Sequence, residues 1–286
     1  MLRSFVVRIT LAMVALGMGN RTGAAQTWST VDNKPPPPPA LARSVCAQKA
    51  TNSAMDALRL VCRRESFDRS LTEVASAQTI VIGFVGGFVK ADDTRHPEVL
   101  FASYLRERYT SGVSVKVFSN HDGSGAMSYV MGRLDTNHDG FISSEERKQA
   151  KIIIYGHSWG ASQTVALARA LQRVGIPVLL TIQLDIISKL HQEPTLIPSN
   201  VVKAINFYQS EGPLRGRSHI VAVDPAQTTI LGNIRMEYNS SAINCDNYNW
   251  FVRTFNRPHH ELENDPRVWN QVAALVDTNV LTERRQ

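Results

Sequence analysis

The chain has 286 residues, of which 43% are hydrophobic and 20% charged, a composition typical of a globular protein with one sizeable core. Three of its 31 lysines and arginines, and none of its 25 acids, lie in the first 25 residues, so the remainder has 28 basic side chains and a net charge of only +3. Because no lysine/arginine cluster is interleaved with aromatic residues, the sequence gives no support for nucleic-acid binding.

Residues 1–25 have the pattern of a secretory signal peptide. Arg3 and Arg8 accompany the short apolar run ITLAMVALGMG, and the small residues TGAA follow, with cleavage expected after Ala25. A membrane anchor is the alternative, but the apolar run has about half of the roughly 20 residues that a spanning helix needs. We therefore expect no stable membrane span and an exported protein, either secreted or periplasmic.

The next segments are predicted to be a linker and a helical extension. Residues 26–39 end in KPPPPP, which indicates a stiff polyproline linker. Residues 40–77 are expected to form an N-terminal helical extension without catalytic residue types. An exported chain with three cysteines can form one disulfide, and the sequence leaves the pairing among Cys46, Cys62 and Cys245 open.

From residue 78 onward, runs of strand type alternate with amphipathic helical segments. The predicted strands are 79–85, 113–118, 151–155, 177–184, 202–208, 219–223 and 233–238, and the predicted helices are 96–109, 126–134, 161–175 and 265–280. Such alternation predicts an α/β fold over residues 78–286, with a mostly parallel sheet covered by helices on both faces.

Residues 135–146, DTNHDGFISSEE, match the calcium-binding loop of an EF-hand at every diagnostic position. Gly140 provides the sharp turn, and the predicted ligands are Asp135, Asn137, Asp139, the Phe141 carbonyl, Ser143 (through water) and bidentate Glu146. No second loop of this type is found, which favours a single, weak and structural Ca²⁺ site. Ser158 follows only twelve residues after Glu146, so the ion is expected to hold the connection into the next strand.

The motif GHSWG (156–160) lies between a predicted buried strand and a predicted helix, the context of a nucleophile turn. Ser158 is then the expected nucleophile, and it requires a base, an acid and an oxyanion hole. The strand and glycines of TIVIGFVGGF are the expected source of the hole, with the backbone N–H groups of Phe84 (or Val85) and Trp159 as donors. A phosphate-binding loop is not favoured there, because neither G-K-[ST] nor G-x-G-x-x-G spacing is present.

The acid and the base are expected to follow the nucleophile in the chain order Ser, Asp, His. Asp185 and Asp224 each end a predicted strand after the nucleophile helix. His259 and His260 are the histidines that come after both aspartates. The residues alone leave both choices open.

The stretches VIGFVGGF, IIIYGHSWGA, LLTIQLD and HHELENDPRVW resemble the α/β-hydrolase superfamily, particularly its secreted lipase- and esterase-like members. The resemblance covers about 70% of the chain, and it implies Asp185 as the acid and His259 as the base. His259 is favoured because Glu261, Leu262 and Glu263 follow it with the acid–aliphatic–acid spacing of such members. The calcium-type loop departs from the family pattern.

The sequence as a whole therefore predicts an exported serine hydrolase that cleaves small-molecule or lipid carboxylic esters through an acyl-enzyme on Ser158. Two alternatives remain open. One is a thioesterase, amidase or acyltransferase with the same three residues, and the other is a catalytically silent, calcium-dependent binding module.

Overall fold

The computed structural model describes residues 78–238, 243–246, 248 and 256–281. The predicted signal peptide, linker and helical extension, and with them Cys46 and Cys62, lie outside the described residues. None of the helices in these ranges combines the length and the apolar character that crossing a bilayer requires.

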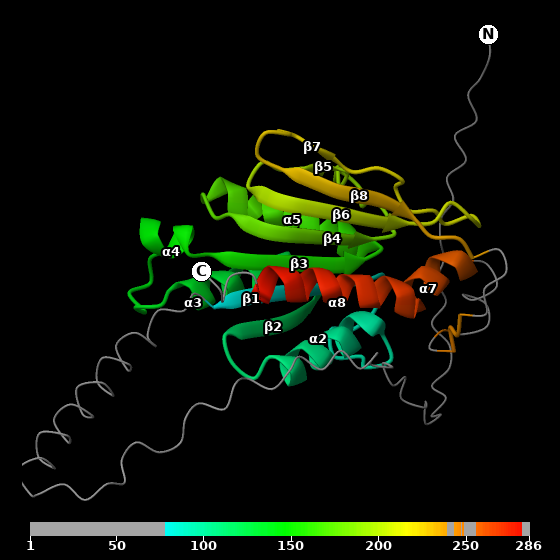
Figure 1. Cartoon of the computed structure of the whole chain (residues 1–286), viewed down its shortest axis with the longest axis horizontal. Helices are drawn as coiled ribbons and strands as arrows, with labels where there is room; N and C mark the ends of the chain where they lie inside the picture. The colour runs from blue at the N-terminus through cyan, green and yellow to red at the C-terminus, as the bar shows by residue number, and fades with distance from the viewer. Residues whose placement is uncertain (1–77, 239–242, 247, 249–255, 282–286) are drawn as a thin grey trace, which may run out of the picture. The chain divides into compact units, whose positions relative to one another are not determined.

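The centre of the fold is a six-stranded sheet in which every neighbouring pair of strands is parallel (Figure 1). In spatial order the strands are β2 (Val113–Ser119), β1 (Thr79–Val85), β3 (Lys151–His157), β4 (Val178–Leu184), β6 (Val201–Tyr208) and β8 (Thr229–Arg235). The central strands are almost continuous runs of buried residues, as expected for strands covered on both faces.

Helices cover both faces of this sheet. On one face, α3 (Gly123–Leu134) and α5 (Trp159–Arg173) pack against each other and against β1, and their apolar residues share one core cluster with Ile80 and Ile152. On the other face lie α2 (Pro97–Arg108) and α8 (Pro266–Leu281), where the Phe101 and Trp269 rings are 5.3 Å apart between centroids. Figure 1 shows α8 crossing the front of the strands. This arrangement confirms the predicted α/β-hydrolase-like fold.

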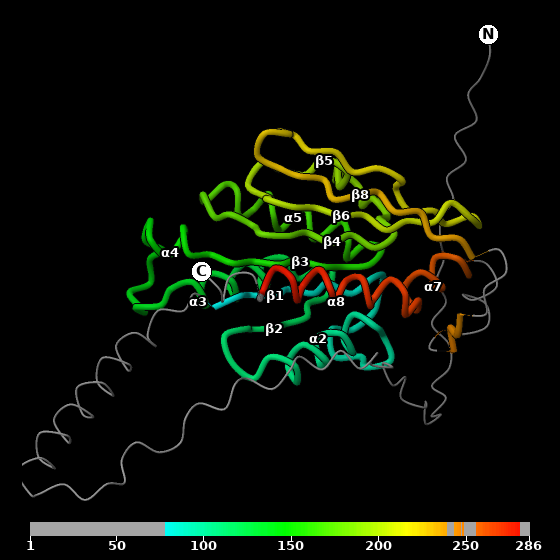
Figure 2. The backbone as a smooth tube through the Cα atoms, viewed as in Figure 1, coloured from blue at the N-terminus to red at the C-terminus, as the bar shows by residue number. Residues whose placement is uncertain are grey.

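Two short helices lie next to longer elements of the fold. The five-residue α4 (Ser144–Lys148) lies directly before β3, and α7 (Arg257–Asn264) lies directly before α8. The tube in Figure 2 shows that α7 lies beyond the carboxyl ends of the strands, which is the edge where β3 turns into α5. The loops at this edge therefore bring together residues that are far apart in the sequence.

One strand prediction was wrong. Residues 219–223 were expected to form a strand of the main sheet, but only β7 (Val221–Ala222) is extended, and it pairs with β5 (Leu196–Ile197) in a separate two-stranded sheet. Val221 and Val223 are 50% and 62% exposed, whereas Ile220 is buried in the core cluster, so this run is covered on one side only. The last main strand is β8, four residues earlier than the predicted start at residue 233.

Candidate active site

The site is built around a sharp turn between β3 and α5. Ser158 lies at this turn with φ 57° and ψ −121°, a conformation that non-glycine residues rarely adopt. Its backbone N–H donates to the Leu184 carbonyl at 2.9 Å, which ties the turn to the end of β4. A strained serine of this kind, presented between a strand and a helix, is the geometry of a nucleophile elbow.

The two glycines of GHSWG are required by close packing at this turn. A Cβ atom on Gly160 would lie 2.3 Å from the Phe84 carbonyl oxygen, and one on Gly156 would lie 2.6 Å from the Gly160 carbonyl carbon. All of these neighbours are backbone atoms, which cannot rotate away. The motif is therefore dictated by the approach of β1, β3 and α5 to one another.

Ser158, His259 and Asp185 form one hydrogen-bonded relay. The Ser158 Oγ and His259 Nε2 atoms are 3.0 Å apart, and His259 Nδ1 is 2.6 Å from Asp185 Oδ2. Ser158 is 8% exposed, His259 2% and Asp185 0%. His259 lies in the first turn of α7, a helix that was not among the predicted ones. The three residues come from three segments separated by 27 and 74 positions, so their meeting is a property of the fold.

Asp185 is held by a residue that the sequence analysis did not identify. The backbone N–H of Gln209 donates to Asp185 Oδ1 at 3.1 Å, and the Gln209 side-chain amide donates to Oδ2 at 2.8 Å. Asp185 itself has φ 45° and its N–H donates to the Phe207 carbonyl at 2.7 Å. The carboxylate thus accepts three hydrogen bonds, one of them from His259. Gln209 follows β6 directly, and its position past a strand end was the only sequence signal available.

The alternative acid and base lie outside this relay. Asp224 is in a partly exposed turn, where its Oδ1 accepts the Ala226 N–H at 2.9 Å. The His260 ring packs on Tyr248, with centroids 3.8 Å apart, and its Nδ1 is 3.5 Å from Glu263. Burial lowers the pKa of His260 despite the nearby Glu263 carboxylate. Its ring therefore belongs to a different set of contacts from that of His259.

The predicted oxyanion donors fare differently. Trp159 is the first residue of α5, so its N–H has no partner one turn earlier in the helix and lies next to Ser158. Phe84 does not fit the role, because it lies within the sheet, paired with Phe118 on one side and Gly156 on the other. Backbone N–H groups of such a strand are directed at its neighbours. The runner-up, Val85, is still paired with Ser119.

The two glycines that follow β1 are better placed than Phe84. A Cβ atom on Gly86 would lie 3.2 Å from Ser158 Cβ, which puts this segment against Ser158. Gly87 has φ 41°, and its carbonyl accepts the side-chain amide of Asn120, a residue with no exposed surface. The Asn120 carbonyl in turn accepts the Lys189 ammonium, and burial lowers the pKa of Lys189 to about 8.

Aromatic side chains border Ser158. Phe88 is 70% exposed, and its ring meets the Trp159 ring edge-on with centroids 5.5 Å apart. The His121 ring also lies edge-on to the Trp159 ring, with centroids 6.3 Å apart. Exposed apolar side chains are common singly, but a pair next to a strained serine provides a contact surface for an apolar group.

The calcium-type loop connects α3 to α4, and its oxygens are already organised by the backbone. Asp135 accepts the N–H groups of Asp139 and Gly140 at 3.1 and 3.0 Å, and the Asn137 side-chain oxygen accepts Asp139 N–H at 3.1 Å. Glu146 accepts both the backbone and hydroxyl groups of Ser143 and of Thr136, at 2.8–2.9 Å. These bonds, those of Ser143 first, lower the pKa of Glu146 to about 2.

The remaining predicted ligands of this loop lie at its surface. The Phe141 side chain is 78% exposed, its N–H donates to Asp139 Oδ1 at 2.8 Å, and Ser143 is the N-cap of α4. All donors of the loop are hard oxygens, which is the chemistry that Ca²⁺ requires. The loop is therefore compatible with a calcium ion by donor type.

No protein-family model matches this chain, and neither does any curated protein. Among solved structures, the chain is similar to an uncharacterized protein from Pseudomonas aeruginosa, with 10% identity and a TM-score of 0.33 over 64% of this chain and 44% of that one. It is also similar to the RedJ thioesterase from the prodiginine biosynthetic pathway in Streptomyces coelicolor, with 11% identity and a TM-score of 0.34 over 72% of this chain and 92% of that one. The chain thus spans less than half of the first of these structures. At these values, the fold assignment depends on the sheet order and the helix layers described above.

Proposed function

We propose that this chain is a serine hydrolase that cleaves carboxylic esters, including lipid-like ones, through an acyl-enzyme on Ser158. The observation that carries the proposal is the buried relay from Ser158 through His259 to Asp185, at 3.0 and 2.6 Å. A serine hydroxyl is a weak nucleophile unless a base accepts its proton, and an oriented imidazole is such a base.

In the proposed reaction, His259 Nδ1–H donates to Asp185, which leaves Nε2 to accept the Ser158 proton. The Ser158 oxygen bonds to the acyl carbon, and the protonated imidazole gives its proton to the departing alkoxide. A water molecule then attacks the acyl-enzyme, transfers a proton to His259 and releases the acid. Ser158 recovers its proton in that last step.

The oxyanion that forms on the acyl group needs donors aligned in advance. We assign these donors to the backbone N–H groups of Trp159 and Gly87. Trp159 follows the nucleophile, and Gly87 lies in the turn whose preceding residue contacts Ser158. Asn120 fixes the Gly87 carbonyl and so limits rotation of this turn. The exposed Phe88 ring beside Trp159 supports an apolar acyl group as the bound part of the substrate.

The loop at 135–146 is proposed to bind one Ca²⁺ as a structural ion, with the ligands that the sequence predicts. Its support is the completeness of the loop pattern and the ionised, preoriented Glu146 carboxylate. Export is proposed on the N-terminal signal pattern alone. Extracellular calcium modules bind with Kd values of about 10⁻⁴–10⁻³ M, a range that suits a weak single site.

A fluorophosphonate probe tests the nucleophile directly, because it reacts with activated serines. We expect wild-type protein to be labelled and Ser158→Ala to be unlabelled, with equal labelling of Ser162→Ala as the matched control. Parallel assays with p-nitrophenyl esters, acyl thioesters and anilides then separate an esterase from a thioesterase or amidase, and added alcohol acceptors test for acyl transfer. Absence of labelling together with absence of hydrolysis would favour the binding-module alternative.

A further inference from the structure

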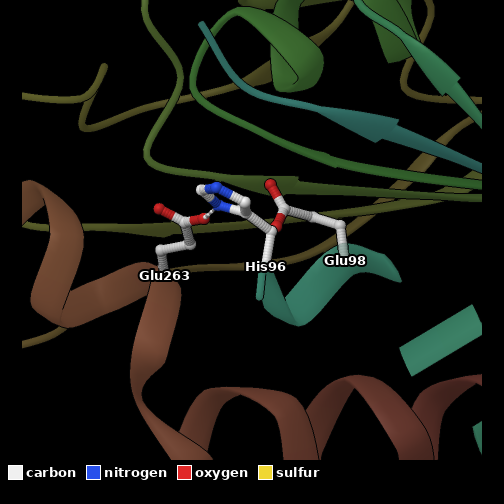
Figure 3. A group of neighbouring side chains, drawn as sticks. All are labelled: His96, Glu98 and Glu263. Atoms are coloured by element: carbon white, nitrogen blue, oxygen red, sulfur yellow. Dashed lines mark hydrogen bonds and ion pairs between the residues drawn. The ribbon is translucent and has the colours of Figure 1, made fainter. Parts of the chain in front are cut away.

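A second group of titratable side chains lies next to the relay and has no part in the proposed reaction. It consists of His96, Glu98, His157 and Glu263, which we call the His/Glu cluster. Their exposed fractions are 5%, 0%, 2% and 1%, so all four are shielded from solvent. Figure 3 shows the His96, Glu98 and Glu263 side chains converging from the start of α2 and from α7. His157 ends β3, immediately before Ser158.

Donor atoms of three members of this cluster are close enough to share one ion, and His157 lies beside the two carboxylates. One ligand atom each of His96, Glu98 and Glu263 lies within 4.8 Å of the others. His96 Nδ1 is 2.9 Å from Glu263 Oε1, and His157 Nδ1 is 3.5 Å from Glu263 Oε2 and 3.7 Å from Glu98 Oε1. Metal–ligand bonds of 2.0–2.2 Å in tetrahedral geometry place neighbouring ligand atoms about 3.4 Å apart. The observed separations bracket that value.

Histidines are the charged neighbours of the two carboxylates in this cluster among the described residues. Glu98 and Glu263 are two buried carboxylates, and within the described ranges no lysine or arginine forms an ion pair with either of them. Both side-chain oxygens of Glu98 lack a hydrogen-bond partner among the described residues. Burying an unpaired carboxylate is strongly unfavourable, so the site must supply a positive charge or a proton. Burial, together with the adjacent Glu263 carboxylate, raises the pKa of Glu98 well above its usual range.

Neighbouring groups hydrogen-bond to the proposed ligands, as residues around the direct ligands of metal sites do. The Tyr248 hydroxyl donates to Glu263 Oε2 and lies 3.2 Å from His96 Nδ1. Asp93 Oδ2 is 3.9 Å from His96 Nε2, and the Trp269 indole N–H donates to the Glu263 backbone carbonyl at 2.6 Å. These contacts orient the His96 imidazole and restrain the segment that carries Glu263.

We propose that the His/Glu cluster binds a divalent transition-metal ion, with Zn²⁺ as the best match to two imidazoles and two carboxylates. Nitrogen and carboxylate donors in this number suit Zn²⁺, whereas Ca²⁺ takes oxygen donors only. The bound ion joins α2, β3 and α7. Since α7 also carries His259, whose ring centroid is 4.5 Å from that of His157, the metal would stabilise the region that holds the base.

The test uses the full chain after treatment with chelator and dialysis, with Zn²⁺ alone as the probe. Calorimetry and elemental analysis are expected to give one bound Zn²⁺ per chain, with Tm raised by about 5 °C or more at a hundredfold excess over Kd. Co²⁺ in the same site should give the visible absorption of a tetrahedral ion. The readouts do not depend on hydrolysis, so the proposal stands or fails independently of the serine-hydrolase assignment.

Glu98→Gln keeps the shape of the side chain and removes its charge. Loss of a residue that only hydrogen-bonds to a ligand weakens metal binding by about 10–100-fold. Loss of the charge of Glu98, a direct ligand, should weaken Zn²⁺ binding by more than that. Glu237→Gln and His219→Ala at the surface are matched controls that should bind Zn²⁺ as wild type does. If Glu98→Gln does not fold, His96→Gln takes its place. Zn²⁺ binding that survives both cluster variants would overturn the proposal. Absence of Zn²⁺ binding to wild type would also overturn it, and a higher Tm for Glu98→Gln would then identify Glu98 as a buried protonated acid.

Discussion

Asparagine at position 185 separates the charge of the proposed acid from its shape. Asparagine tolerates the positive φ of 45°, so the backbone should be unchanged. In wild type, Oδ2 faces two donors, His259 Nδ1 and the Gln209 amide, while Oδ1 faces the Gln209 N–H. An asparagine NH₂ group placed at Oδ2 meets His259 only if the imidazole moves its proton to Nε2. That tautomer cannot accept the Ser158 proton.

The expected loss in kcat follows from this geometry. The wrong tautomer costs about 10⁴-fold in a serine hydrolase, or about 5 kcal/mol of transition-state stabilisation. If the amide flips instead, its NH₂ group opposes the Gln209 N–H, and the lost buried hydrogen bond costs about 1–3 kcal/mol of stability. We therefore expect Asp185→Asn to lose about 10³–10⁴-fold in kcat while Tm falls by no more than about 10 °C.

The assay is p-nitrophenyl ester hydrolysis at saturating substrate, with thermal melting of the same samples. Asp224→Asn is the matched control, because its carboxylate accepts only a local turn N–H from Ala226 and is expected to keep activity within about twofold of wild type. Wild-type kcat in Asp185→Asn, or a larger loss in Asp224→Asn than in Asp185→Asn, would refute the relay.

Three further outcomes are expected. His259→Ala should lose about 10⁴–10⁶-fold in kcat, because nucleophile and base act as a unit. His260→Ala should keep most of the wild-type kcat, and the reverse result in ester hydrolysis would identify His260 as the base. Gly160→Ala should lower the free energy of unfolding by about 1–3 kcal/mol, since its Cβ would lie 2.3 Å from the Phe84 carbonyl oxygen. Gly132→Ala, with open space around its Cβ, should raise that free energy by up to about 1 kcal/mol, and denaturant melts measure both. Glu146→Gln should abolish a calcium-dependent rise in Tm of a few degrees, and a wild-type Tm that ignores calcium would mean the loop is not a calcium site.

The sequence revealed those parts of the site that depend on local chain chemistry. The strand–GHSWG–helix pattern located the strained Ser158, because the whole motif lies within one short run of the sequence. Chain order and the family resemblance pointed to Asp185 and His259. The choice between His259 and His260 is made by α7, where adjacent residues are about 100° apart around the helix axis and so face different partners. That helix was not among the predicted helices, so the residues alone left the choice between the two histidines open.

Local sequence patterns could not predict contacts between segments that are distant in the chain. Gln209 supports Asp185 across 24 positions, and His96 reaches Glu263 across 167. Neither Gln209 nor His96 belongs to a recognisable sequence motif. The failure at Phe84 has the same origin, because its role depends on where β1 stops pairing with its neighbours. A strand end is among the least certain features to read from a single sequence.

The position of the calcium-type loop relative to Ser158 decides whether an ion could govern the reaction rate. The strand between them, β3, pairs with β1 from Lys151 to Gly156 and with β4 from Ile153 to His157, so both of its edges are held by the sheet. Residues 152–157 are buried throughout. Within the loop, Glu146 is already held by Ser143 and Thr136 on either side. An ion added there tightens the loop but cannot shift Ser158 without breaking the pairing of β3. The rate of ester hydrolysis well below Tm should therefore be flat against free calcium while Tm rises with it. A rate that falls on chelation at a temperature where the protein stays folded would show instead that the loop positions the nucleophile.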